Sequence, residues 1–312
     1  MKCGLAKDVD RLIERQTASW AMLAQGLDGL SRSQTRAERV AGRDVLVRHI
    51  PHRIVSTTAA VDPASVSRRP CFLCPANLPP GEEGIAFDAD FTIYCNPFPI
   101  LDRHLTIVHA EHRPQGIGGS VGAMWRLAEA LPGFFIIYNG AECGASAPDH
   151  LHFQACSRAI FPIEEDTRGF HGRFIPNYGR RVFVFRERNA LRLEEEIHAL
   201  MTILGEVAPR AAEPMVNIAV FHDHAGWTTF VFPRAKHRPR VYETGELTVS
   251  PAAIDLCGIF VVPVLSDFER IRGVDIERIF EEVTLPEGPF EDALKRLESK
   301  FPSFAKEGNL EV

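Results

Sequence analysis

The sequence predicts an α+β fold with antiparallel sheet, because its strand-like and helix-like segments do not alternate in a strict βαβ order. The strand-like segments alternate apolar and polar residues or form short apolar runs, whereas the helix-like segments repeat apolar residues three and four positions apart. The longest apolar runs, at 133–138 and 258–265, have the length of strands and fall far short of the roughly 20 residues of a membrane helix. With 312 residues, the chain can bury a large core as one domain or as two halves.

The expected elements follow in chain order. Apolar residues at helical spacing between Val9 and Leu30 predict an amphipathic helix that begins after Asp8 or Asp10. Strands are expected in the first half near 45–49, 53–58, 91–95, 104–108, 134–138 and 150–156, with a helix near 121–131. A connecting loop is expected at residues 166–180. Beyond it we expect a helix near 191–207, strands near 216–221, 227–232, 246–250 and 259–264, and a terminal helix near 290–300.

Composition narrows the function classes. The formal net charge of −6 argues against a general nucleic-acid or membrane surface. Seven cysteines, an odd number, argue against a disulfide scaffold and favour a reducing compartment, so we expect a cytoplasmic protein. The first eight residues contain no apolar segment, and no signal peptide is expected.

A short strand carries the most informative pattern. Leu151 and Phe153 alternate with polar residues and are expected to point into the core. His150, His152 and Gln154 then share the opposite face, roughly 6.6 Å apart along the strand. A neutral histidine can attack phosphorus, and a neighbouring amide can donate hydrogen bonds to phosphate oxygens. The pattern favours phosphate chemistry over the plainer alternative, a surface hairpin with two incidental histidines.

The loop before this strand, residues 139–149, is rich in small residues. Gly140 and Gly144 permit positive φ and close approach of the backbone to a ligand. Consecutive N–H groups in such a loop can form an anion-binding nest. Gly144, Ala145 and the Ser146 hydroxyl are therefore predicted to bind substrate.

Cys71 and Cys74 form a Cys-x-x-Cys pair beside a proline-rich turn, which is typical of half a zinc site. His112 follows the expected strand 104–108, and His150 opens the histidine strand. Together these four residues would make a closed, tetrahedral and therefore structural zinc site that also positions His152. A redox dithiol and two unliganded buried cysteines remain as alternatives.

Basic residues gather in a second stretch, 234–240. Lys236, His237 and Arg238 could clamp a phosphate, and a solvated basic turn explains them equally well. The tripeptide His-Arg-Pro occurs here and at 112–114, which is weak evidence that residues 104–114 and 228–239 are related by duplication. Arginines in the loop 166–180 are expected to be solvated, and the histidine pair at 222 and 224 is expected to be an ordinary loop pair and not a second metal site.

At this point the chain resembles a known family, the galactose-1-phosphate uridylyltransferase and dinucleoside polyphosphate phosphorylase branch of the histidine-triad (HIT-like) superfamily. The resemblance extends from about residue 53 to about residue 267. Its carriers are Cys71-Phe-Leu-Cys74, Asn96-Pro-Phe-Pro-Ile100, His104-Leu-Thr-Ile107, His112, Gly144-Ala-Ser146 and His150-Leu-His152-Phe-Gln154.

The resemblance implies a role for each matching residue. His152 is the nucleophile that takes up a nucleoside monophosphate, Gln154 and Ser146 hold its phosphate, and Asn96 and Asn139 lie near the nucleoside. The zinc ligands of the uridylyltransferases match Cys71, Cys74, His112 and His150. The fold implied is two HIT-like halves with antiparallel sheets flanked by helices: residues 1–165 with the zinc site and the motif, a linker at 166–180, and residues 181–312 without the nucleophile.

Details of the motif favour a phosphorylase activity over that of the hydrolases or the uridylyltransferases. Hydrolases that resemble this motif carry a third histidine where this chain has Gln154, and a glutamine is typical of transferases and phosphorylases. The uridylyltransferases have proline where this chain has Leu151. GDP-L-galactose phosphorylase has a similar Asp-His-x-His-Phe-Gln string, which begins here at Asp149.

We therefore expect an enzyme that transfers a nucleoside monophosphate from a nucleoside-diphosphate sugar or dinucleoside polyphosphate. The acceptor would be phosphate or a sugar 1-phosphate, and the intermediate a nucleotidyl-histidine. The alternatives are a nucleotidyl hydrolase and a non-catalytic nucleotide sensor. The expected cofactor is structural zinc and the expected ligands are nucleotides and phosphates, with no nucleic-acid or membrane partner; a homodimer is left open.

Overall fold

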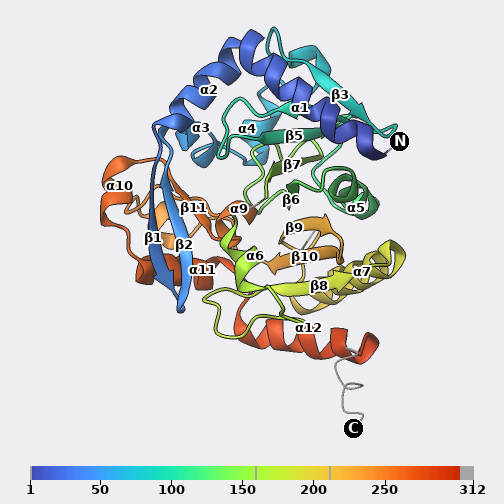
Figure 1. Cartoon of the computed structure of the whole chain (residues 1–312). Coiled ribbons are helices and arrows are strands. Elements are labelled where there is room, and N and C mark those ends of the chain that lie inside the picture. The colour runs from blue at the N-terminus through green and yellow to red at the C-terminus, as the bar shows by residue number, and fades with distance from the viewer. Residues whose placement is uncertain (1, 159, 211, 303–312) are drawn as a thin grey trace.

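A computed structural model describes residues 2–158, 160–210 and 212–302. Its centre is an eight-stranded sheet in which every neighbouring pair is antiparallel (Figure 1). In spatial order the strands are β3 (Gly84–Phe87), β4 (Phe91–Cys95), β5 (His104–His109), β7 (His152–Ser157), β6 (Phe134–Asn139), β9 (Val216–Asp223), β10 (Gly226–Pro233) and β8 (Phe183–Glu187). The predicted α+β class with antiparallel sheet is confirmed.

The order of elements is repeated within this sheet. The first unit is β5, helix α5 (Val121–Ala130), β6 and β7, and the second is β8, helix α7 (Ala190–Val207), β9 and β10. In each unit the last strand lies between the other two, and the units meet where β6 pairs with β9. The duplication suggested by the two His-Arg-Pro tripeptides pairs the wrong strands. It matches β5 with β10, whereas the strand that corresponds to β5 in the second unit is β8.

A smaller sheet joins the two ends of the chain. The hairpin β1 (Gln34–Val40) and β2 (Arg43–His49) pairs with β11 (Ile259–Val262), and the β2–β11 pairing is parallel. The strand expected at 53–58 is wrong: this segment continues the short helical turn η1 (Pro51–Arg53) into α3 (Ile54–Thr57). Proline at the first helical position favours this turn, because its φ is preset and its missing N–H needs no partner there. The strand expected at 246–250 is also absent.

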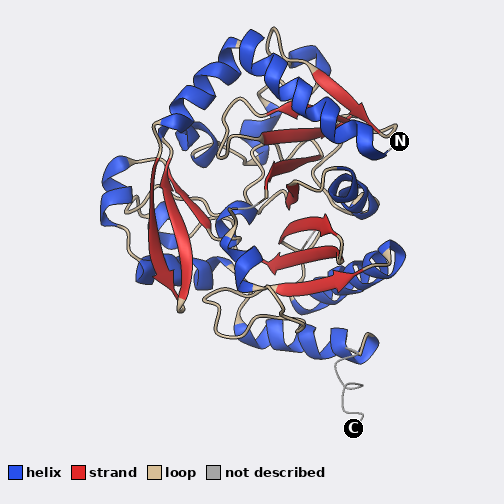
Figure 2. Ribbon diagram, in the orientation of Figure 1, coloured by secondary structure: helices blue, strands red, loops and turns tan. Residues whose placement is uncertain are grey.

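Helices cover the sheets on the outside (Figure 2). The sequence predicted one helix at the start of the chain, but the structure has two helices there, α1 (Lys2–Ser19) and α2 (Ala21–Ser31). They are separated by extended backbone at Trp20. The terminal helix α12 (Glu287–Lys300) packs against α7. The other helical segments are α4 (Pro63–Ser67), η2 (Pro75–Asn77), α6 (Pro162–Asp166), α8 (Arg240–Glu243), α9 (Ala253–Leu256), α10 (Leu265–Arg270) and α11 (Gly273–Val283). Within the described residues, none of the helices combines the length and the apolar character that a membrane span requires.

The loop at 166–180 is more buried than expected. Arg173 makes a two-point ion pair with Glu196, and Arg180 is 2% exposed and donates to the Leu256 carbonyl oxygen at 2.6 Å. The expectation of solvated arginines is therefore wrong for these two, whereas Arg168 is exposed. A buried guanidinium needs acceptors, and tertiary partners from α7 and α9 supply them here.

Candidate active site

Four side chains form a compact cluster with the donor set of a metal site. The ligand atoms of Cys71, Cys74, His112 and His150 all lie within 4.8 Å of one another. The Cys71 Sγ lies 3.3 Å from His150 Nδ1, and the Cys74 Sγ lies 3.2 Å from His112 Nδ1. Two sulfurs and two imidazole nitrogens at these separations suit a tetrahedral ion, and the cluster is able to hold a metal.

A hydrogen bond at the edge of the cluster orients His150 as a metal ligand. His150 Nε2 donates to the His109 carbonyl oxygen at 2.8 Å, so its Nδ1 lone pair faces the sulfurs. Burial raises the pKa of the Cys71 thiol to about 11. A reactive redox dithiol needs a lowered thiol pKa, so this environment argues against that alternative, and a bound cation would offset the cost of the thiolate. Within the described chain this is the one such group, and His222 instead lies against the Trp227 ring.

His152 stands at the start of β7 with its ring orientation set by the backbone. Its Nδ1 lies 2.8 Å from the His150 carbonyl oxygen, which can only accept, so Nδ1 carries the proton and Nε2 keeps its lone pair. Burial lowers the pKa of His152 to about 4, and the ring is neutral near pH 7. Gln115 holds the strand here, because it accepts from the His152 N–H at 2.8 Å and donates to the Asn139 carbonyl oxygen at 2.7 Å.

Gln154 has one end of its amide occupied. The Ile100 N–H donates to His104 Nδ1 at 3.2 Å, so His104 Nε2 carries the proton and donates to Gln154 Oε1 at 2.9 Å. With its oxygen bound to His104, Gln154 can offer its NH₂ group to a ligand. Burial lowers the pKa of His104 to about 3, which keeps this ring neutral. We did not identify His104 or Gln115 as site residues from the sequence, because their roles depend on strand register.

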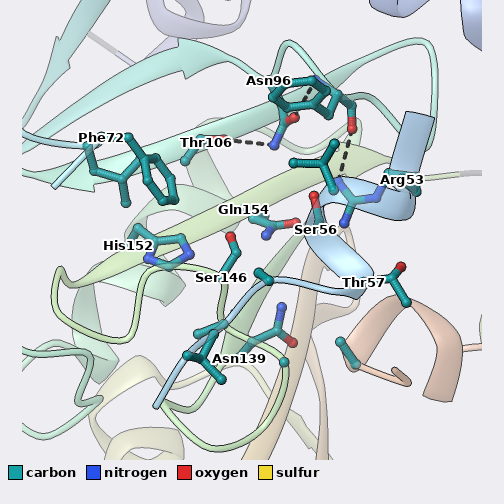
Figure 3. A pocket seen from close by; sticks show the side chains of 18 of the residues that line it. Arg53, Ser56, Thr57, Phe72, Asn96, Thr106, Asn139, Ser146, His152 and Gln154 are labelled. Atoms are coloured by element: carbon teal, nitrogen blue, oxygen red, sulfur yellow. Dashed lines mark hydrogen bonds between the residues drawn. The ribbon is translucent and has the colours of Figure 1, made fainter. Parts of the chain in front are cut away.

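A cavity of about 610 Å³ adjoins these residues. Figure 3 shows the Ser146 hydroxyl between the His152 ring and the Gln154 amide. Gly144 has a φ of +95°, and a Cβ there would lie 2.7 Å from the Ala252 Cβ, so this position requires glycine. The predicted site residues that line the cavity are Asn96, Asn139, Gly144, Ala145, Ser146, His152, Gln154, His237 and Arg238.

The two asparagines differ in the groups that they leave for a ligand. Asn96 uses both ends of its amide within the protein, since it donates to Thr106 Oγ1 at 3.0 Å and accepts from the Phe98 N–H at 2.9 Å. The Asn139 oxygen accepts from Asn217 at 2.7 Å and from the Ala253 N–H at 3.0 Å. Its NH₂ group thus remains for a ligand.

The basic stretch divides into residues with different roles. Arg234 is 2% exposed and donates to Asn217 and to backbone carbonyl oxygens, so it is structural. Lys236 pairs with Glu282 and lines a neighbouring groove, not the cavity beside His152. His237 and Arg238 do line the cavity, and Arg238 also donates to the Thr57 and Ala59 carbonyl oxygens at 2.9 Å each.

Two further residues at the cavity were missed. Arg53 lies beside Ser56 (Figure 3) and donates to the Phe98 carbonyl oxygen at 3.0 Å, while its buried Nε has no partner among the described atoms. Its position was hidden by the wrong strand at 53–58. Phe72, between the two cysteines, is 43% exposed and lines the cavity, and an exposed aromatic beside a ligand cysteine was a signal that could have found it.

Comparisons with known proteins agree with this architecture. A domain of unknown function (DUF4922) matches residues 12–157, and the family described as GDPGP1-like, C-terminal domain matches residues 161–300. No curated protein matches the chain significantly.

Solved structures of yeast Ap4A phosphorylase Apa2 share the fold. The complex with AMP matches with a TM-score of 0.61 at 15% identity, covering 89% of this chain and 96% of that one. The complex with Ap4A matches with a TM-score of 0.63 at 14% identity, covering 89% and 98%. The chain therefore shares the fold of this phosphorylase, in agreement with the expectation from its motifs, and residues 161–300 match the family described as GDPGP1-like, C-terminal domain.

Proposed function

We propose that this chain is a nucleotidyltransferase of the phosphorylase type, which transfers a nucleoside monophosphate to phosphate or a sugar 1-phosphate through a nucleotidyl-histidine at His152. One observation carries the proposal: His152 Nε2 has a free lone pair at a cavity, beside the Ser146 hydroxyl and the free amide end of Gln154. The shared fold with a phosphorylase that has been solved with AMP and with Ap4A supports it.

The first step forms one bond and breaks one bond. Neutral His152 Nε2 attacks the α-phosphorus, and the bond from this phosphorus to the bridging oxygen breaks, so a sugar 1-phosphate or a nucleotide leaves with the electron pair. Donors aimed at the phosphoryl oxygens stabilise the developing charge, and the Ser146 hydroxyl and Gln154 amide are placed to supply them. Arg53, with its unpartnered Nε, is a further donor at this cavity.

The second step reverses the first with a different oxygen. An oxygen of inorganic phosphate attacks the α-phosphorus, the phosphorus–nitrogen bond breaks, and a nucleoside diphosphate is released. The imidazole returns to its neutral tautomer, with the proton still on Nδ1, because the His150 carbonyl oxygen still accepts the hydrogen bond from Nδ1–H. Positioning supplies most of the catalysis in a reaction of this kind.

The metal would have a structural part in this scheme. We propose zinc, which suits two cysteines and two histidines and would be held by Cys71, Cys74, His112 and His150. Its chemistry there is to bind the thiolates and imidazoles and hold the loop to the strand. Because His150 is in the cluster and its carbonyl oxygen orients His152, the cluster and the nucleophile are connected by one residue.

The test is a substrate screen with phosphate as acceptor. Wild-type protein is incubated with nucleoside-diphosphate sugars and with dinucleoside polyphosphates, each with labelled inorganic phosphate. We expect label in the nucleoside diphosphate product. Label that stays in phosphate while nucleoside monophosphate accumulates would show that water is the acceptor, and the phosphorylase assignment would be wrong.

A further inference from the structure

Asn217 is a fully buried polar residue that no step above uses, although it contacts a side chain of the cavity. It lies on β9 opposite Asn139 of β6, so Asn217 belongs to the second unit and Asn139 to the first. The Asn217 Nδ2 donates to Asn139 Oδ1 at 2.7 Å and to the Cys143 carbonyl oxygen at 2.7 Å. Asn139, and not Asn217, is among the residues that line the cavity.

Arg234, directly after β10, sets the orientation of the Asn217 amide. A guanidinium has five N–H donors and no acceptor, and Arg234 uses all five: one for Asn217 Oδ1 and four for backbone carbonyl oxygens. These carbonyl oxygens belong to Lys236, His237, Pro251 and Val283. Because Arg234 can only donate, the Asn217 oxygen must face it and the Asn217 NH₂ group must face Asn139.

Two backbone groups fit these orientations, and each can bond in one direction only. The Cys143 carbonyl oxygen accepts from the Asn217 NH₂ group, and the Ala253 N–H donates to Asn139 Oδ1 at 3.0 Å. Reversing either amide would bring donor against donor or acceptor against acceptor at a buried position, which is costly. The NH₂ group of Asn139 is therefore the end that faces the cavity, and Figure 3 shows its nitrogen on the side of Ser146.

We propose that Asn217, held by Arg234, is a positioning residue that keeps Asn139 oriented as a hydrogen-bond donor to the substrate. The substrate group that meets Asn139 is then an oxygen that accepts, on a phosphate or on a sugar hydroxyl. An amide fixed in this way is already in its bound orientation, which lowers the cost of binding. The inference gives the second unit a part in the site of the first. It rests on the proposed function, because it assigns a nucleotide to this cavity.

The experiment measures nucleotide binding, and not turnover, by titration calorimetry at pH 8. AMP, GMP and UMP are the probes, and the nucleotide that binds wild type most tightly is used for every variant. Asn217→Asp keeps an acceptor for Arg234 but turns a second acceptor towards Asn139, which then presents its own oxygen to the ligand. We expect this variant to bind about 10- to 100-fold more weakly than wild type.

Asn217→Ala removes the donor without supplying an acceptor. The Ala253 N–H alone still orients Asn139 in this variant, so nucleotide binding should weaken by less than about fivefold. A control, Asn189→Asp, adds the same charge as Asn217→Asp at the start of α7, where the side chain accepts from backbone N–H groups. Aspartate suits that position as well as asparagine does, and this control should bind nucleotide like wild type.

A double-variant cycle shows whether Asn217 acts through Asn139. In protein that already carries Asn139→Ala there is no amide to orient, so Asn217→Asp and Asn217→Ala should bind nucleotide equally, within about twofold. The corresponding nucleoside serves as a second probe. If Asn217→Asp weakens nucleoside and nucleotide by the same factor, the acceptor oxygen belongs to the sugar, whereas weakening of the nucleotide alone places it on the phosphate.

Several results would overturn the inference. Wild-type affinity in Asn217→Asp would contradict it, and so would a difference between Asn217→Asp and Asn217→Ala that persists in the Asn139→Ala background, because Asn217 would then act on structure alone. Thermal melts report the folding of each variant. Asn139→Asp keeps both hydrogen bonds to the oxygen of residue 139 and tests the donor without any change at Asn217; wild-type affinity there would also overturn the inference. Failure of the proposed function looks different: the binding pattern would hold, yet no nucleotide would be transferred to phosphate.

Discussion

Strands β7 and β10 occupy the same position in the two repeated units, yet only β7 carries reactive side chains. One face of β7 places Phe153 and Ala155 in the apolar core, while His152 and Gln154 on the other face open onto the cavity. In β10 both faces are covered, with Val231 in one core cluster and residues such as Phe230 in the other.

The difference shows what a reactive strand requires in this fold. A strand buried on both faces by apolar side chains is stable but has no face for a ligand, whereas the open face of β7 must satisfy its polar groups in other ways. It does so through Gln115, His104 and the His150 carbonyl oxygen. These bonds leave one free atom on each reactive side chain, which is how the two strands differ chemically.

The largest expected effect comes from removing the reactive group of β7. His152→Ala should lower turnover by at least about 10³-fold, because loss of the nucleophile removes the covalent route. The protein should still fold and keep its metal, which circular dichroism and metal analysis check. The matched variant on β10 is Thr229→Val, whose buried hydroxyl has no partner in the described structure. It should leave turnover unchanged and stabilise the fold by about 1 kcal/mol.

Removing metal ligands should produce the next largest effect. Purified protein should contain about one zinc per chain. Cys71→Ser and Cys74→Ser should lower the metal content and also the unfolding temperature, by more than about 5 °C, since binding energy at such a site is folding energy. Activity should fall with the metal. Stoichiometric metal in the Cys71/Cys74 double variant would show that the ion binds elsewhere.

A matched pair of variants can separate the two hydrogen bonds that His104 makes, one with the Ile100 N–H and one with Gln154. In His104→Gln the amide nitrogen can replace Nε2 and still donate to Gln154, whereas in His104→Asn the shorter side chain keeps only the bond to the Ile100 N–H. We expect His104→Asn to lower kcat by about 10²-fold and His104→Gln to retain more activity. Equal kcat values for the two variants would mean that His104 does not position Gln154.

The smallest expected effect concerns stability and pH. Glu82 has a folded pKa of about 7, above its ordinary value of 4.5, so the folded state holds this proton more tightly than the unfolded state. Its contribution to stability is therefore present at low pH and is lost as pH rises from about 4.5 to 7. Urea unfolding at several pH values should show Glu82→Gln matching wild type near pH 4 and exceeding it above pH 7. A constant difference would contradict the raised pKa.

Local patterns were predicted well from the sequence. The alternation at 150–154 and the spacing of Cys71 and Cys74 lie within a few residues, so side-chain direction and turn geometry follow from the chain itself. The predicted four-residue cluster also forms, with His112 and His150 brought from two other segments.

Contacts that depend on distant register were not predictable. Gln115 and His104 reach the site because β5, β7 and the loop after β5 are adjacent. The motif at 104–107 contains His104 but does not reveal its partner Gln154, and no local pattern indicates Gln115. The segment 53–58 contains β-branched residues and was expected to be a strand, yet the turn that begins at Pro51 made it helical. The residues around Arg234 in the sequence do not distinguish it from a solvated arginine. Its burial is explained by backbone carbonyl oxygens that the folded chain brings to it.

The most direct test of the central claim is to trap the intermediate. Wild-type protein is incubated without phosphate with the nucleotide substrate that the screen identifies, and its intact mass is measured. We predict a mass increase of one nucleoside monophosphate, located on the peptide that contains His152 and released as nucleoside diphosphate when phosphate is added. Turnover without any adduct, or an adduct that persists in His152→Ala, would contradict the account.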